Sequence, residues 1–388
     1  MRVWGRSLRS LIVLVLVGCA ADAPSPIKVE RVDSAGVEVV TNRGADQILA
    51  WSFEREFALG GEDDGPESFY LVSPTTVGVD AEGRIYVLDA TSRHVVVFDA
   101  DGGYLRTLGR EGGGPGELTW PSNMSVALDG TVSVYDFGKR ALVRFGPGGE
   151  ILDELRPEIG YQGPSLRVVG PDIYYTAFQH RQQEPTSFQR LMVWRDGEAR
   201  ELAQLEHPTT PMVSFPSCGF TFPASPVFAP TLVWDAVADV AVANRGVDYV
   251  VDVYRDGRLA LSVRRDIAPR AVTEALALRQ LEAQGRSINN CPIPAEEYLQ
   301  KAGHAPVIPV VQGVTIELGG GLWVRRGHVA GEAAPVDIFG GDGTYRGTLP
   351  AGSPFPVLFL PDGRIAAIEK DEMDIMRLVV YRTGIDRT

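Results

Sequence analysis

Short apolar runs separated by tight polar turns repeat along the chain. In the clearest unit the apolar runs are Thr76–Val79, Ile85–Leu88, Val95–Phe98 and Tyr104–Leu108. Turns rich in Gly and Asp, such as Asp101-Gly102-Gly103, stand between them. Short apolar runs bounded by such turns are typical of β-strands joined in antiparallel hairpins. The pattern therefore predicts one four-stranded antiparallel sheet per unit.

The unit recurs with a period of about 48 residues, the kind of period that marks a repeat architecture. Leu59-Gly60 returns as Leu108-Gly109, and Asp89 at the end of a run returns as Asp136. A second unit covers 125–155, and weaker units cover 166–205, 231–264, 313–349 and 356–381. The last unit has only three runs, and Trp51–Leu59 is the candidate for its missing outer strand. We expect an all-β, six-bladed β-propeller closed by an N-terminal strand, which protects the edges of the terminal blade.

Two segments carry a family resemblance. VGVDAEGRIYVLDATSRHVVVFDADGGYL (77–105) and GREGGGPGELTWPSNMSVALDGTVSVYD (109–136) resemble NHL repeats. The resemblance covers two blades clearly and the other four only by spacing and turn chemistry. It implies a six-bladed propeller, a fold that binding proteins, lactonases and lyases share, so the fold does not fix the function.

The long connections all fall on one face of the predicted propeller. They are 109–121, 155–165, 177–189, 206–226, 266–309 and 326–335, whereas the turns on the other face are uniformly short. Long ordered loops in compact domains are usually functional. The largest contains a helical insertion, 268–304, between blades four and five, with helices expected at Arg270–Gln284 and Ala295–Ala302. This insertion is either a cap packed on the rim or a lid over the channel mouth.

The N-terminus reads as an export signal. Three arginines precede the apolar run Leu11–Val17, which is too short to span a bilayer but fits a secretory signal. Leu16-Val17-Gly18-Cys19 resembles the lipobox of bacterial lipoproteins, which implies cleavage before Cys19 and a lipid anchor on it. An ordinary signal peptide with a chance cysteine is the alternative. The expected division is a signal peptide at 1–18, a tether at 19–27 and the propeller at 28–388.

Two consequences of export follow. Position 20 is not Asp, so the resemblance implies the cell envelope, at the periplasmic or outer face of the outer membrane if the cell has one. Cys218 and Cys291 remain as an even pair in an oxidising setting, and we expect them to form a disulfide; two buried thiols are the alternative.

Charge narrows the class of partner. The net charge of −13 disfavours nucleic acid and an anionic membrane surface, so only the lipid anchor would contact a membrane. Cationic and aromatic residues recur on the long-loop face and would suit an unknown protein or an anionic small-molecule or glycan ligand. These candidates are Arg93, His94, Trp120, Asn123, Arg140, Tyr161, His180, Arg181, Arg245, Arg326 and His328. The alternative is that the cations pair with neighbouring acids.

Signals for catalysis are poor. The five histidines are scattered, and neither a nucleophile elbow nor a phosphate loop is present. Asp89 and Asp136 are either paired carboxylates or turn caps of the repeat, and Asn123 and Glu317 form no coherent metal set. The sequence therefore favours a binding protein without catalytic residues or a cofactor. The alternative is a lactonase-like hydrolase or lyase with a divalent cation in the channel.

Overall fold

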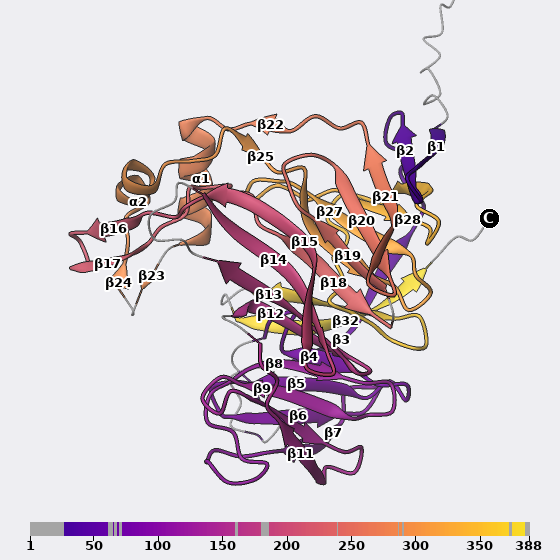
Figure 1. The fold of residues 1–388 in the computed structure, drawn as a ribbon, viewed down its shortest axis with the longest axis vertical. Coiled ribbons are helices and arrows are strands. Elements are labelled where there is room, and N and C mark those ends of the chain that lie inside the picture. Colours follow the sequence, from indigo (N-terminus) through magenta and orange to yellow (C-terminus); the bar gives the residue numbers. More distant parts are fainter. Residues whose placement is uncertain are drawn as a thin grey trace, which may run out of the picture.

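The computed structural model describes residues 27–60, 65, 68–69, 72–159, 162–179, 186–238, 240–285, 287–288, 291–371 and 375–384. Within them the chain forms a six-bladed β-propeller with a helical extension at one side (Figure 1). Each blade is an antiparallel sheet of four strands, and the sheet of blade 4 is extended by a hairpin. The predicted fold class is confirmed.

The blades follow one another along the chain. Blade 1 is β4 (Val77–Val79), β5 (Ile85–Asp89), β6 (His94–Phe98) and β7 (Tyr104–Leu108). Blade 2 is β8 (Pro121–Val126), β9 (Val132–Asp136), β10 (Ala141–Phe145) and β11 (Ile151–Leu155). Blade 3 is β12 (Gln162–Val169), β13 (Asp172–Gln179), β14 (Thr186–Arg195) and β15 (Glu198–Pro208). Blade 4 is β18 (Val233–Val237), β19 (Val240–Asn244), β20 (Val250–Arg255) and β21 (Arg258–Arg265). Blade 5 is β26 (Val311–Ile316), β27 (Leu322–Arg326), β28 (Val336–Phe339) and β29 (Tyr345–Thr348). Blade 6 is β30 (Leu358–Phe359), β31 (Ile365–Lys370), β32 (Met376–Gly384) and, from the N-terminus, β3 (Ser52–Leu59).

The inner strands of each sheet, such as β5 and β9, are buried on both faces, which explains why they are continuously apolar rather than alternating. In β5, Val87 packs into the cluster shared with blade 6, whereas Tyr86 and Leu88 pack into the cluster shared with blade 2. Four further clusters join blades 2 and 3, 3 and 4, 4 and 5, and 5 and 6. The six apolar interfaces close the ring, and burial of each medium-sized side chain in them contributes about 1.5–3 kcal/mol.

Neighbouring sheets approach closely near the centre, where glycine is required. Gly78 lies in the innermost strand of blade 1, and a Cβ there would stand 2.4 Å from Cγ2 of Val126 in blade 2. The tight turn after β4 is fixed by Asp80, whose carboxylate accepts hydrogen bonds from the backbone N–H groups of Glu82 and Arg84. Gly83 completes this turn with φ +79°, a conformation that favours glycine.

The N-terminal segment runs along the outer edges of three blades. β1 (Lys28–Ser34) and β2 (Val37–Arg43) form a hairpin whose second strand pairs in parallel with β21 of blade 4. Ile48 then bridges to Thr348 of blade 5, and β3 pairs with β32 to complete blade 6. Closure of the last blade by Trp51–Leu59 was predicted. The hairpin was not, and it lies outside the blades although it falls within 28–388.

Some strand bounds differ from expectation. β8 begins at Pro121 rather than Ser125, and β13 and β14 extend to Gln179 and from Thr186, which shortens the predicted loop 177–189. These strands are longer than predicted because their end residues form hydrogen bonds with the neighbouring strand. The local hydrophobic pattern does not indicate how far such pairing extends.

Candidate functional site: a polar cavity between the helical insertion and blade 5

The insertion and the preceding crossing form a small module at one side of the propeller (Figure 1). Its elements are β16 (Met212–Phe215), β17 (Phe220–Pro223), β22 (Arg270–Ala271), α1 (Glu274–Gln284), β23 (Ser287–Ile288), β24 (Cys291–Pro292), α2 (Ala295–Ala302) and β25 (Val307–Ile308). The module has its own apolar cluster, in which Phe215 stacks on Phe222 and on Tyr298. The predicted disulfide between Cys218 and Cys291 is present and joins the crossing to the insertion.

Helix α1 begins four residues later than the expected 270. Thr273 is its N-cap and accepts a hydrogen bond from the N–H of Leu276, while residues 270–271 pair as β22 with β25. Gly285 ends the helix, as expected, and α2 has the bounds that the sequence predicts.

Polar contacts hold α1 against the loop 327–335 of blade 5. Glu332 pairs with Arg270, with Oε2 and Nη1 2.9 Å apart, and also with Arg279. Burial raises the pKa of Glu332, but the hydrogen bonds from Arg279 and Arg270 outweigh it, and the pKa lies below its ordinary value. Gln280 Oε1 accepts a hydrogen bond of 2.7 Å from the N–H of Ala330. These contacts pack the insertion against blade 5.

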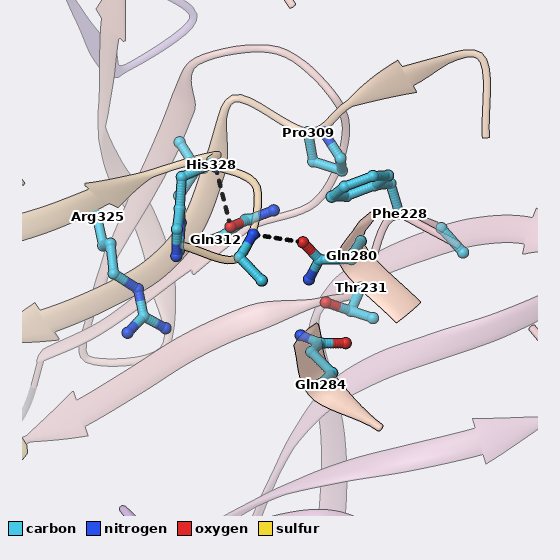
Figure 2. A pocket seen from close by; sticks show the side chains of 11 residues that line it. Phe228, Thr231, Gln280, Gln284, Pro309, Gln312, Arg325 and His328 are labelled. Carbon is cyan, nitrogen blue, oxygen red and sulfur yellow. Dashed lines mark hydrogen bonds between the residues drawn. The ribbon is translucent and has the colours of Figure 1, made fainter. Parts of the chain in front are cut away.

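A cavity of about 410 Å³ lies between α1, the segment that precedes β18, and strands β26 and β27 of blade 5 with the loop that follows them. Figure 2 shows Gln280 and Gln284 of α1 on one side of it and Arg325 and His328 of blade 5 on the other. Phe228, Pro309 and Val311 supply apolar surface. Most of the lining is polar, with apolar surface from a few side chains. A concave site with convergent polar groups can hold a polar small molecule, and the volume falls in the range that such sites occupy.

A β-bulge places Gln312 in the cavity wall. Val311 pairs with Arg326 and Gly313 with Arg325, so Gln312 is the extra residue between two consecutive pairs. A bulge re-aims a side chain relative to the regular alternation of a strand. Here Oε1 of Gln312 accepts a hydrogen bond of 3.3 Å from the N–H of His328.

Arg325 carries a charge with no acidic partner among the described residues. Its Nε atom is buried without a hydrogen bond, and its guanidinium lies 4.7 Å from the ring centre of Phe355. Burial lowers the pKa of Arg325 from its ordinary value. Gly313 leaves room for this arrangement, since a Cβ at that position would stand 3.2 Å from Arg325 Nε.

Arg326, the next residue, is fully paired. Its Nε and Nη2 donate to the two oxygens of Asp337 at 2.9 and 2.7 Å, and Nη2 lies 2.7 Å from Oδ2 of Asp46. Burial acts to lower the pKa of Arg326, but the Asp337 and Asp46 carboxylates outweigh it and raise the pKa. The buried Arg265 of blade 4 donates to the same two carboxylates, at 3.1 and 3.0 Å. Two arginines and two aspartates thus balance in a network that ties the N-terminal segment to blades 4 and 5.

His328 is half-buried beside Arg325. Burial and the nearby Arg325 charge lower the pKa of His328 from its ordinary value. Near neutral pH the ring is therefore uncharged. Its Nδ1 donates to the carbonyl oxygen of Arg326 at 3.4 Å, which leaves Nε2 as an acceptor for a molecule in the cavity.

Several residues predicted for the long-loop face are engaged in local contacts. Arg93 pairs with Glu111, and Arg245 Nε lies 3.0 Å from Oδ2 of Asp252, as Arg326 pairs with Asp337. For these three arginines the alternative of pairing with neighbouring acids is confirmed, and they do not form a free cationic ring.

The aspartates that end equivalent strands are turn caps. Asp89 accepts hydrogen bonds from the N–H groups of Thr91 and Ser92, and Asp136 from those of Thr119 and Lys139. The interpretation of these residues as repeat-specific caps is confirmed.

The remaining predicted residues lie apart from the cavity. Trp120 is 64 % exposed and packs edge-on against Phe137 with ring centres 5.2 Å apart. Arg140 is exposed, and His94 begins β6 with a buried Nε2 that lacks a hydrogen bond among the described residues. Asn123 is buried in β8. Among the described residues of the predicted face, only His328 lines the cavity. Cys19, Tyr161, His180 and Arg181 lie outside the described residues.

Sequence reasoning missed Arg325 and the three glutamines of the cavity. Arg325 lies at the end of an apolar run, directly before the predicted Arg326, and nothing in the sequence distinguishes it from other strand ends. The bulge at Gln312 has no signature in the local sequence. The helix prediction for 270–284 did contain Gln280 and Gln284, so the available signal was that the insertion presents two amides one helical turn apart.

No group of three or more His, Cys, Asp or Glu side chains within the described ranges is arranged to hold a metal ion. Asn123 lies at the long-loop end of β8, whereas Glu317 belongs to the tight turn between β26 and β27 and accepts a hydrogen bond from the indole of Trp323. The two residues are therefore on opposite faces. No helix in the described part of the chain is long and apolar enough to cross a membrane.

Comparison with known proteins identifies the fold. The model of a family described as a 6-bladed beta-propeller (DUF5128) matches residues 65–203. No curated protein matches the sequence.

Three solved structures are similar to this chain. A Bacteroides fragilis protein described as an exported protein has 12 % identity and a TM-score of 0.49, covering 89 % of this chain and 99 % of its own. A member of the DUF4221 family from Bacteroides vulgatus has 10 % identity and a TM-score of 0.47, covering 87 % and 100 %. The calcium-binding protein regucalcin from Agrobacterium tumefaciens has 12 % identity and a TM-score of 0.37, covering 86 % and 94 %.

Proposed function

We propose that this propeller is an exported, lipid-anchored binding protein that takes a small molecule into the cavity between α1 and blade 5. The observation that carries the proposal is the cavity itself, because it lies where the insertion meets the propeller and gathers polar side chains from both. Its three glutamines, one arginine and one histidine can orient a ligand by hydrogen bonds while Phe228 and Pro309 contact its apolar part. The proposed binding needs no cofactor, since these side chains make the contacts themselves.

The sequence supports export and lipid anchoring, and the disulfide supports export alone. Residues 1–18 have the pattern of a secretory signal, and Cys19 ends the lipobox-like tetrapeptide. The Cys218–Cys291 disulfide fits an oxidising compartment of the cell envelope. Labelling of the expressed protein with radioactive palmitate, compared between the native chain and a Cys19→Ala variant, tests the anchor. Equal labelling of both would contradict it.

Ligand binding in the cavity is tested by filling it. Ala330 lines the cavity and contributes its backbone N–H to Gln280, so Ala330→Trp fills the space without removing that donor. Ala283, exposed on α1 and outside the cavity lining, provides the matched control Ala283→Trp. Calorimetric titration uses three probes of fitting size: N-acetylglycine, glucuronate and glucose.

We expect at least one of these probes to bind the native protein with one-to-one stoichiometry. Binding should be lost in Ala330→Trp and kept in Ala283→Trp. If none of the probes binds, or if Ala330→Trp binds as the native protein does, the cavity is not a ligand site.

A further inference from the structure

We propose that the cavity is specific for a small organic carboxylate, with Arg325 as its counter-ion. This inference rests on the proposed function and names the class of its ligand. It starts from the contrast between two adjacent arginines, one neutralised within the protein and one not.

Arg326 is an arginine with a structural role, and acidic side chains of the same chain pair with it. Asp337 and Asp46 neutralise Arg326 together with Arg265, and the shared carboxylate of Asp337 is fully buried. Every charge in that network has a partner. Even partial burial of an arginine without a partner costs free energy, and Arg325 is half-buried with its Nε atom fully enclosed.

Arg325 has that unpaired charge at a cavity wall. Within the described residues its guanidinium makes no ion pair and no hydrogen bond, and it lies against the ring of Phe355. None of the described residues that line the cavity is acidic. Glu332, on the adjacent loop, is already occupied by Arg270 and Arg279. A bound anion would supply the missing partner.

The other polar groups fit a carboxylate better than a phosphate. One guanidinium matches one carboxylate through two parallel hydrogen bonds. Beside it stand an uncharged His328 and the amides of Gln284 and Gln312, which can bond hydroxyl or amide groups of the same ligand but add no positive charge. A phosphate dianion would leave about one negative charge uncompensated in this half-buried site.

The test uses acetate as the minimal probe and acetamide as its neutral isostere. Each is titrated into the intact mature chain, and the ring signals of His328 are followed by NMR in protein labelled on histidine. We expect a saturable, millimolar response to acetate and at least a tenfold weaker response to acetamide, because charge-assisted hydrogen bonds are about twice as strong as neutral ones. Inorganic phosphate in parallel reports whether any anion suffices.

Variants assign the response to Arg325. Arg325→Gln should abolish the acetate response, Arg325→Lys should keep part of it, and Arg258→Gln, which removes an exposed arginine far along blade 4, should leave it unchanged. Thermal unfolding of each variant establishes that it is folded. Arg325→Lys provides a second reading if the glutamine variant does not fold.

Three outcomes would overturn the inference: equal responses to acetate and acetamide, phosphate binding more tightly than acetate, or an unchanged acetate response in Arg325→Gln. These failures are distinct from failure of the proposed function. Binding of glucose that Ala330→Trp blocks, without an acetate response, would keep the ligand site and remove the anion.

Discussion

Arg325 and Arg326 are neighbours in β27, and we expect their replacement by methionine to have different effects on the free energy of unfolding. Arg326→Met removes two hydrogen bonds to Asp337, one to Thr348 and the contact with Asp46. Breaking a buried ion pair by removing one partner costs about 3–5 kcal/mol, because the other charge stays buried. Since Arg265 still bonds to Asp337, we expect a loss of about 2–4 kcal/mol.

Arg325→Met removes a half-buried charge that has no acidic partner in the described structure. The variant loses the contact with the Phe355 ring, worth about 0.5–2 kcal/mol, but it also loses the cost of burying an unpaired guanidinium. We therefore expect a stability within about 1 kcal/mol of the native value.

Urea unfolding measures both variants. Tryptophan fluorescence is a suitable signal because Trp323 is buried in blade 5 next to these arginines. The m-values should be unchanged, so the midpoints report stability directly. Equal losses in the two variants would refute the reasoning, since they would mean that Arg325 is as firmly paired as Arg326.

Three other substitutions test the fold. Replacing both Cys218 and Cys291 by serine opens a loop with a separation of 73 residues, and the chain-entropy model puts the loss in free energy of unfolding at about 4 kcal/mol. Amide hydrogen exchange should become faster in α1 and α2 but not in blades 1 and 2. Faster exchange throughout the chain would contradict a local role of the disulfide. Burial raises the pKa of Asp136, but hydrogen bonds from three backbone N–H groups and one hydroxyl outweigh it, and the pKa is lowered. This carboxylate therefore stabilises the fold above its unfolded pKa and loses that effect as the pH falls through its folded pKa. Asp136→Asn should lower the free energy of unfolding by about 1–3 kcal/mol at pH 7. In thermal unfolding, the difference in stability between the variant and the native protein should shrink below about pH 4. A difference that stays constant across pH would exclude the charge as the cause. Gly78→Val should cost at least about 1–3 kcal/mol in urea unfolding through its overlap with Val126, and a native-like midpoint would show that blades 1 and 2 can separate.

Most of the propeller could be predicted from the sequence because each blade is formed by residues that are close together in the chain. Paired strands such as β4, β5 and β6 follow one another in the chain, and Gly/Asp turns such as Asp80–Gly83 fix the register between β4 and β5. Patterning within about 48 residues is therefore enough to recognise a blade. Repetition then predicts the ring, and the incomplete last unit predicts closure by β3. The disulfide followed in the same way from an even number of remaining cysteines.

Only the tertiary structure decided which charged side chains are paired with an opposite charge and which are not. Arg325 and Arg326 are indistinguishable in the sequence, yet Arg326 meets Asp46, which is 280 residues away along the chain, while Arg325 meets no acid in the described structure. The hairpin β1–β2 on the edge of blade 4 and the bulge at Gln312 are equally invisible to local patterning. Pairing and burial of charge depend on contacts between distant segments, and the cavity exists only because α1 packs over blade 5. The sequence by itself therefore determined the ring of blades, and tertiary packing determined where the cavity lies and which charged side chains face it.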